Sequence, residues 1–264
     1  MYLYRMNLEQ RRKERTRLFI EKHDRDKVLI GELISEYFSI VPAPDVKILD
    51  FGCGRGVTVE YLRSRGYDAH GCDIQATWGE PGPYALISLE PYRLPYEDNS
   101  FDVVYSTSVL EHAKNQEEYF REIRRVLKIG GISLHIFPGK WYLPYEPHVR
   151  IPLMNFFWPH CPKWWIFSWI IVRMLYAPKS GIKPGKLLHQ YCDFRDNSII
   201  YVTNKRYRQL SMNVFGNFGS LMDFYIERAQ GGFARLARKL PFRTISGWIS
   251  ANFRMNVIYQ RKEA

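Results

Sequence analysis

The stretch from Val46 to Gly56, VKILDFGCGRG, constrains the fold more than any other part of the chain. An apolar run ends in an acid, Asp50, and glycines then stand at alternate positions, namely Gly52, Gly54 and Gly56. A short apolar run of this kind is typical of a buried strand. Glycines directly after a strand permit a tight turn and let a ligand approach the backbone. The stretch therefore predicts a strand, a ligand-binding turn and a helix in succession.

The spacing of these glycines excludes two common nucleotide-binding loops. A GxGxxG loop needs a small residue at the position that Val57 occupies, and no GK[ST] sequence follows as in a P-loop. An acid, Asp73, ends the next predicted strand, 17 residues after Gly56. An acid at that place grips the diol of a ribose in nucleotide-binding sheets. The pattern therefore favours a nucleoside ligand.

Predicted strands alternate with predicted helices along much of the chain. We expect strands at 46–50, 67–73, 84–89, 101–106 and 132–137, and helices at 26–39, 57–65 and from Asn115 to a stop at Gly130 and Gly131. Alternation of this kind indicates a mostly parallel sheet covered by helices on both faces. Ligands of such sheets bind at the carboxyl ends of the strands.

The segment LEPYRLPYEDNSFDVVYSTSVLEH, residues 89–112, completes a recognisable pattern. It places Glu90 after the third strand and VLEH after the fourth. With the glycine turn, it resembles the class I S-adenosylmethionine-dependent methyltransferases, in particular the broad subgroup with a VLEH-type segment. The resemblance is specific over about residues 46–138.

This resemblance implies the fold, the cofactor and the cofactor-binding residues. The fold would be an α/β Rossmann-like one, with a central, mostly parallel seven-stranded sheet, helices on both faces and an insertion after the fifth strand. The cofactor would be S-adenosyl-L-methionine. Asp50, Gly52, Gly54 and Gly56 would hold its methionyl part, Asp73 its ribose, Ile74 and Glu90 its adenine, and Ser106, at the start of the loop after the fourth strand, would meet it by backbone.

We divide the chain into four parts on this basis. Residues 1–45 form a basic helical segment, 46–139 the cofactor-binding core, 140–200 a basic aromatic insertion or lid, and 201–264 the rest of the sheet. In the last part we expect a helix at 207–214 and strands at 221–227 and 254–260.

The acceptor is narrowed mainly by exclusion. Family members that methylate amino groups of adenine or glutamine carry (N/D)PP(Y/F) after the fourth strand, and cytosine C5 enzymes carry a Pro-Cys nucleophile. This chain has STSVLEH there. We favour the hypothesis that the protein O-methylates a small-molecule, glycan or lipid-linked acceptor, as in a cell-surface polysaccharide or lipid pathway. An RNA-directed enzyme and a non-catalytic cofactor-binding module remain open.

Two histidines are candidate general bases for a hydroxyl acceptor. His112 lies just past the fourth strand, and His148 lies after the fifth with Glu146 two residues earlier as an orienting carboxylate. Each histidine has a plain alternative, a capping role for His112 and a loop position for His148. Some relatives that methylate RNA sugars bind a metal through ExxEH, but Ser108 occupies the first acid position here. The pairs His160-Cys161 and His189-x-x-Cys192 lack a common zinc spacing, so we expect no metal.

Charge is distributed unevenly along the chain. Residues 46–137 hold 10 Lys and Arg against 13 Asp and Glu, whereas the whole chain holds 38 against 27. The segment 140–186 contains one acid, Glu146, with seven basic residues and five tryptophans. Tryptophan beside Lys and Arg suits the interface between water and an anionic membrane, although a buried lid is the alternative.

The expected location is the cytoplasm, with possible peripheral contact on the inner face of the membrane. The N-terminus shows no signal-peptide pattern, and the four cysteines show no disulfide-rich pattern. The run 164–172 is too short to span a bilayer, which takes roughly 20 residues. The acidic core makes nucleic acid an unlikely partner, and the oligomeric state is open.

Overall fold

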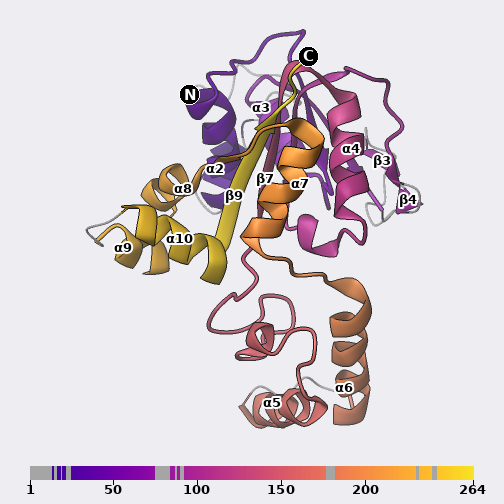
Figure 1. Cartoon of the computed structure of the whole chain (residues 1–264), viewed down its shortest axis with the longest axis vertical. Coiled ribbons are helices and arrows are strands. Elements are labelled where there is room, and N and C mark those ends of the chain that lie inside the picture. Colours follow the sequence, from indigo (N-terminus) through magenta and orange to yellow (C-terminus); the bar gives the residue numbers. More distant parts are fainter. Residues whose placement is uncertain are drawn as a thin grey trace.

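The computed structural model describes residues 14, 17–18, 20–21, 25–74, 84–86, 88–89, 92–176, 182–229, 232–239 and 243–264. A seven-stranded sheet in the order β3-β2-β1-β6-β7-β9-β8 runs through its centre (Figure 1). The strands are β1 (Lys47–Phe51), β2 (Asp68–Asp73), β3 (Tyr84–Leu86), β6 (Phe101–Thr107), β7 (Leu127–Pro138), β8 (Gly219–Ser220) and β9 (Met255–Arg261).

Five of these strands are parallel, and two close one edge of the sheet in mixed direction. The parallel pairs are β2–β3, β1–β2, β1–β6 and β6–β7, whereas β9 is antiparallel to β7 and to β8. The carboxyl ends of β1, β2, β6 and β7 therefore meet at one edge, as the alternating pattern predicts. The prediction of a mostly parallel seven-stranded sheet is confirmed.

Helices cover both faces, each over its own apolar core. On one face lie α2 (Arg25–Glu32), its π-helical extension η2 (Leu33–Tyr37), α3 (Val57–Ser64), α8 (Met222–Arg228), α9 (Gly232–Ala237) and α10 (Arg243–Phe253). On the other lie α4 (Gln116–Val126) and α7 (Asn204–Phe215). Figure 1 shows these two layers on either side of the sheet. Asn115 caps α4 as predicted, because its side chain accepts a hydrogen bond from the backbone N–H of Glu118 at 3.2 Å.

Several element boundaries differ from the sequence predictions, and two of the differences matter for the sheet. The third strand ends at Leu86, and Ser88–Leu89 (β4) pairs instead with Tyr92–Arg93 (β5) in a separate hairpin. Helix α4 ends at Val126 rather than at Gly130. Leu127 already pairs with Phe101, and a register shift precedes the next pair, so the glycines lie inside β7 at an irregularity of the strand.

The predicted strand at 221–227 is wrong. Those residues form α8, whose buried Met222 and Ile226 stand four positions apart on one helical face. A short apolar run of this kind fits either a strand or a buried helix, and periodicity alone does not separate the two. The sheet uses Gly219 and Ser220 instead, which pair with β9.

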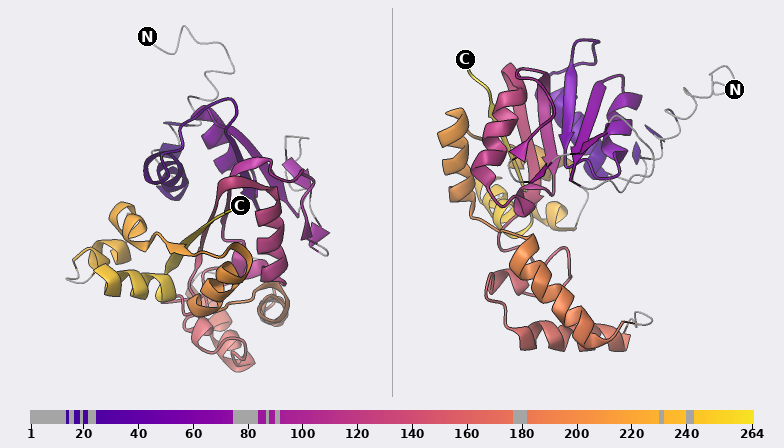
Figure 2. Two further views of the ribbon diagram at one scale, coloured as in Figure 1. Left: turned by 45° about the horizontal axis from the view of Figure 1, so that its top comes forward. Right: turned by 90° about the vertical axis from the view of Figure 1, so that its right-hand side faces the viewer.

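An insertion follows β7 and extends beyond the carboxyl edge of the sheet (Figure 2). It contains η4 (Met154–Phe156), α5 (Lys163–Tyr176), α6 (Pro184–Asp193) and η5 (Phe194–Ser198). These pack around a third apolar cluster that includes Ile151, Met154, Ile166 and Ile170. Among the described residues, no helix has the length and apolarity needed to cross a membrane.

Candidate active site

The glycine turn after β1 is held by its neighbours on both sides. Gly52, Gly54 and Gly56 have φ values of +80°, +52° and +65°, a region that favours glycine. A Cβ on Gly52 would lie 2.3 Å from Cγ2 of Val109, so the segment after β6 packs directly on the turn. The backbone N–H of Gly54 donates to Oδ2 of Asp73 at 2.8 Å. The turn and the acid that ends β2 are therefore one unit.

Asp50 lies beneath this turn and is buried, with 4% of its surface exposed. The pKa of its carboxyl is raised to about 7, chiefly by burial and also by the nearby charge of Asp73. A cation placed beside these two carboxylates would favour their ionised forms. S-adenosylmethionine carries two cationic groups, an ammonium and a sulfonium, so Asp50, the turn and Asp73 fit this cofactor.

The remaining predicted cofactor residues have different outcomes. Ile74 follows β2 with 46% of its surface exposed, an apolar side chain at the carboxyl edge of the sheet. Glu90 lies outside the described residues. The prediction that Ser106 begins the loop after the fourth strand is wrong, because β6 continues to Thr107. The hydroxyl of Ser106 is 2.8 Å from Nδ1 of the buried His135, so this side chain faces β7.

A second group of polar residues lies beyond the carboxyl ends of β6 and β7. The short 3₁₀ helix η3 (Leu110–His112) follows Val109 and carries Glu111 and His112. A turn after β7 carries Glu146 and His148, and an isolated bridge between Tyr145 and Pro152 closes it. The rings of His112 and His148 lie 5.1 Å apart between centroids. The two candidate bases are therefore neighbours, as their positions after adjacent strands predict.

The carboxylate of Glu146 is wholly buried and holds His148 in place. Its Oε1 accepts from Nδ1 of His148 at 2.6 Å and from the hydroxyl of Tyr201 at 2.8 Å. Its Oε2 accepts from the backbone N–H groups of His148 and Val149, both at 2.7 Å. Burial alone would raise the pKa of Glu146, but these bonds and the His148 charge lower it. The predicted pairing of Glu146 with His148 is present.

His148 and His112 are set toward opposite protonation states. Burial disfavours the charged ring of His148, but the bond to Glu146 and the charges of Glu146 and Glu111 outweigh it and raise the pKa of His148. Burial lowers the pKa of His112, although Nδ1 of His112 bonds the carbonyl of Ser198 at 2.7 Å. An imidazole oriented by a carboxylate suits proton removal from a hydroxyl.

Sequence reasoning missed two members of this group. Glu111 is fully buried beside both histidines, with Oε1 4.0 Å from Nε2 of His148. The sequence contained a signal for Glu111, because this acid stands between an apolar residue, Leu110, and the candidate base His112. Tyr201 is 55 residues from Glu146 in sequence, and no local pattern connects them.

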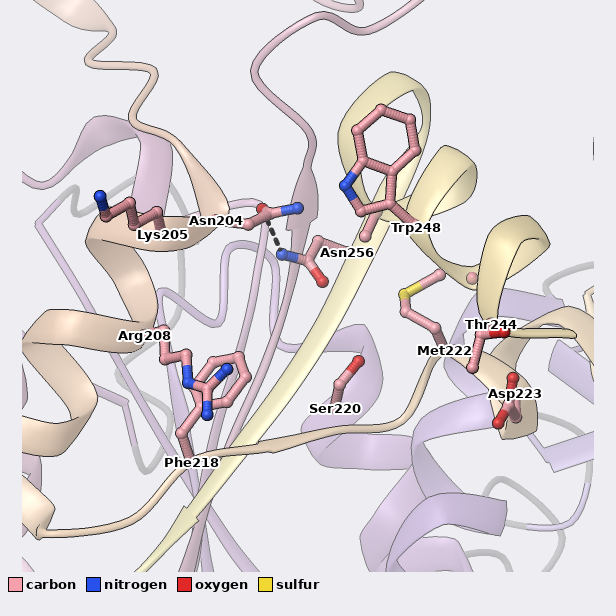
Figure 3. A pocket seen from close by; sticks show the side chains of 12 residues that line it. Asn204, Lys205, Arg208, Phe218, Ser220, Met222, Asp223, Thr244, Trp248 and Asn256 are labelled. Carbon is pink, nitrogen blue, oxygen red and sulfur yellow. Dashed lines mark hydrogen bonds between the residues drawn. The ribbon is translucent and has the colours of Figure 1, made fainter.

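A separate groove lies over the antiparallel edge of the sheet, between α7 and α10 (Figure 3). Its volume is about 460 Å³, and its lining includes Lys205, Arg208, Trp248 and Asn256. Asn256 donates to Asn204 at 2.8 Å across it. None of the residues predicted for the cofactor or the acceptor lines this groove.

Comparisons with known proteins agree on the cofactor-binding region. Residues 49–134 match a family model described as a methyltransferase domain. A sterol 24-C-methyltransferase of Gibberella zeae is 37% identical over 101 residues, covering 34% of this chain and 27% of the relative. A ubiquinone biosynthesis O-methyltransferase of Roseobacter denitrificans is 30% identical over 118 residues, covering 40% of this chain and 46% of the relative.

A solved structure agrees on the fold. The structure of a geranyl diphosphate methyltransferase bound to S-adenosylmethionine aligns with a TM-score of 0.51 at 14% identity, covering 96% of this chain and 90% of the other. The curated relatives above are matched over 27% and 46% of their own lengths. The matched region holds β1, the glycine turn, Asp73, β6 and η3. Residues 49–134 of this chain thus match a methyltransferase domain, and S-adenosylmethionine is the cofactor that this match supports.

Proposed function

We propose that this protein transfers a methyl group from S-adenosylmethionine to a hydroxyl oxygen of a small-molecule, glycan or lipid-linked acceptor. The observation that carries the proposal is the pair of Glu146 and His148. The imidazole of His148 is oriented by the buried carboxylate of Glu146, at 2.6 Å, and lies beside the ring of His112. His112 stands three residues after Val109, the residue that packs on the glycine turn.

The cofactor side follows from the strand ends. S-adenosylmethionine supplies a methyl group on a positively charged sulfur. Asp50 and the turn of Gly52, Gly54 and Gly56 bind the methionyl part, and Asp73 binds the ribose while it orders the turn through Gly54. Ile74 packs on the adenine with its exposed apolar surface, and Glu90 accepts from the adenine amine.

The acceptor side handles one proton. As the new carbon–oxygen bond forms and the carbon–sulfur bond breaks, the hydroxyl proton passes to Nε2 of His148. Glu146 then stabilises the imidazolium through Nδ1, and Tyr201 keeps Glu146 in position. Positioned general bases of this kind contribute about 10²- to 10⁴-fold to a rate.

The insertion supports an acceptor drawn from an anionic membrane surface. Helix α5 buries Ile166 and Ile170 against the insertion core, but Trp164, Leu175 and Tyr176 are 67%, 76% and 87% exposed. The only acid in 140–186 is Glu146, which is buried, so the exposed charges of this segment are all basic. A partly exposed apolar helix beside basic side chains fits the headgroup region of an anionic bilayer.

The named relatives favour apolar acceptors. Two of them act, by their names, on sterols and in ubiquinone biosynthesis. A lipid-linked acceptor would share that apolar character and would be reached from the membrane face of the insertion. Such contact makes the protein peripheral on the membrane rather than embedded in it.

The direct test is to incubate the protein with S-adenosylmethionine labelled in the methyl group and fractions of a cell extract. Label in the lipid or glycan pool is expected, in a bond that resists alkali as an ether does. Label in RNA would replace this proposal with the RNA-directed one. No transfer to any pool, with cofactor binding intact, would leave a cofactor-binding module without catalysis.

A further inference from the structure

Glu111 is a buried acid at the carboxyl edge of the sheet. None of its surface is exposed, and neither carboxylate oxygen has a hydrogen-bond partner among the described residues. Its carboxylate lies 4.0 Å from Nε2 of His148. A buried carboxylate without hydrogen bonds is costly to the fold. A ligand that binds this carboxylate in the folded protein would offset that cost.

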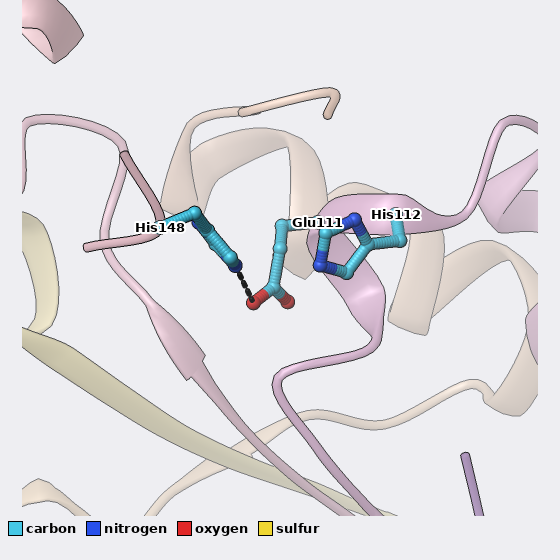
Figure 4. Close-up of side chains that lie close together, drawn as sticks. All are labelled: Glu111, His112 and His148. Atoms are coloured by element: carbon cyan, nitrogen blue, oxygen red, sulfur yellow. Dashed lines mark ion pairs between the residues drawn. The ribbon is translucent and has the colours of Figure 1, made fainter. Parts of the chain in front are cut away.

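In its neutral form, each of the two histidines beside Glu111 offers one nitrogen lone pair to a metal ion. Nδ1 of His112 lies 2.7 Å from the carbonyl oxygen of Ser198, which can only accept, so Nδ1 carries the proton. Nδ1 of His148 likewise donates to Glu146, at 2.6 Å. In the neutral rings the free nitrogen is therefore Nε2 in both cases. Figure 4 shows the Glu111 carboxylate between the two rings, each of which turns a nitrogen toward it.

We infer that Glu111, His112 and His148 bind a divalent transition-metal ion. One ligand atom from each residue lies within 4.8 Å of the other two. Two imidazoles and one carboxylate are a set that suits zinc, iron and manganese better than magnesium or calcium. Ligand atoms at about 2.0–2.2 Å from a metal lie about 3–3.5 Å apart, so the three side chains need to close in by about 1 Å.

The groups around the three residues hold the two histidines in the orientation that a metal site needs. Metal-bound histidines usually donate their other ring N–H to a carboxylate or a backbone carbonyl, which fixes the tautomer. Here His148 donates to Glu146 and His112 to the carbonyl of Ser198. Glu146 is itself held by Tyr201 and two backbone N–H groups. Three protein ligands would leave positions open for acceptor oxygens.

This inference deepens the proposed function and changes the role of one residue. With an ion bound, Nε2 of His148 is a ligand and no longer a base. The ion would instead bind the acceptor hydroxyl and lower its pKa, so that its proton leaves to solvent water. Binding of the ion needs these three ligands and the groups that orient them, but no acceptor, so it can be tested with the protein alone.

The test is a titration of chelator-treated protein with Co²⁺, followed by visible absorption, with Zn²⁺ as competitor and Mg²⁺ as comparison. We expect one equivalent of Co²⁺ to bind with ligand-field bands, Zn²⁺ to displace it, and Mg²⁺ to have no effect at the same concentration. Glu111→Gln and His148→Ala should weaken binding by about 100-fold or more, and Glu146→Gln, through the outer shell, by about 10- to 100-fold.

The matched controls are His160→Ala and His189→Ala, exposed histidines of the same insertion, which should bind Co²⁺ as the wild type does. Thermal unfolding gives a second readout. Zn²⁺ should raise the Tm of the wild type, because it binds the folded state, and should leave that of Glu111→Gln unchanged. Without metal, Glu111→Gln should itself raise the Tm by removing a buried charge.

Two results would overturn the inference. One is a wild-type protein that takes up neither Co²⁺ nor Zn²⁺ at millimolar concentration while it still binds the cofactor. The other is a folded Glu111→Gln or His148→Ala variant that binds Co²⁺ as tightly as the wild type. Metal binding without methyl transfer to any acceptor would instead contradict the proposed function and leave the metal site standing.

Discussion

The proposed cofactor side and the proposed acceptor side of this molecule, called below the cofactor side and the acceptor side, are assembled in different ways. Asp50, the glycine turn and Asp73 lie within 24 residues of sequence, at the ends of two adjacent parallel strands. The acceptor group joins Glu111 and His112 after β6 to Glu146 and His148 after β7, and Tyr201 from beyond the insertion completes it. A local pattern can encode the first side, whereas the second depends on how a long insertion folds back.

The two sides also differ in electrostatics. On the cofactor side, the carboxylates of Asp50 and Asp73 lie beside a turn of backbone N–H groups, and together they favour a cationic ligand. On the acceptor side, two buried carboxylates, Glu146 and Glu111, flank one histidine. Glu146 is fully hydrogen-bonded, and Glu111 is not. If the two groups of residues act independently, substitutions on one side should leave the function of the other side unchanged.

The largest effect is expected on the acceptor side. His148→Ala should lower turnover by about 100-fold or more, whether the imidazole acts as a base or as a ligand. The affinity for S-adenosylmethionine, measured by calorimetry, should stay within about twofold of the wild type. His160→Ala is the matched control, since His160 is exposed in the same insertion. Wild-type turnover in a folded His148→Ala variant would remove this residue from the chemistry.

A smaller effect is expected on the cofactor side. Asp73→Ala should weaken S-adenosylmethionine binding by about 1.5–3 kcal/mol, because a charge-assisted bond to the ribose is lost. The structure adds a second cause, since Gly54 loses the acceptor of its N–H. Asp68→Ala, at the other end of the same strand, is the control. Unchanged affinity in calorimetry would show that Asp73 supports cofactor binding neither through the ribose nor through the turn.

The cofactor side could be predicted from the sequence more completely than the acceptor side, for physical reasons. Strands β1, β2 and β6 and the cap at Asn115 follow from local patterns, because apolar runs, acids and turn residues stand next to one another. The predicted stop at Gly130 failed because pairing of Leu127 with β6 ended the helix earlier. Glu111 and Tyr201 were missed because what matters about them, burial and contact with Glu146 and His148, is tertiary.

The pH dependence of cofactor binding should separate the sides further. The pKa of Asp50 is raised to about 7, chiefly by burial and also by the charge of Asp73, while Tyr105 and Lys27 partly offset the shift. Since a cationic ligand prefers the ionised carboxylate, affinity should be lost as pH falls, by about tenfold between pH 8 and pH 6. Asp50→Asn should bind weakly with a much flatter profile. A wild-type affinity that is constant over this range would mean that Asp50 stays ionised throughout.

The smallest effect on the fold should come from the exposed face of α5. Trp164 and Leu175 are 67% and 76% exposed, so replacing both by Ala should change the free energy of unfolding by no more than about 0.5 kcal/mol each. Cofactor affinity should not change, but binding to vesicles of anionic phospholipid should weaken, because these side chains enter the headgroup region.

The buried face of the same helix supplies the contrast. Ile166→Ala should cost about 2–5 kcal/mol, because Ile166 is fully buried in the insertion core. Lys163→Ala and Lys186→Ala, both exposed, should each weaken vesicle binding by about 1 kcal/mol, and added salt should weaken it further. A wild-type protein that ignores anionic vesicles at low salt would leave the exposed face of α5 without a membrane partner. In that case the acceptor would have to reach His148 from solution.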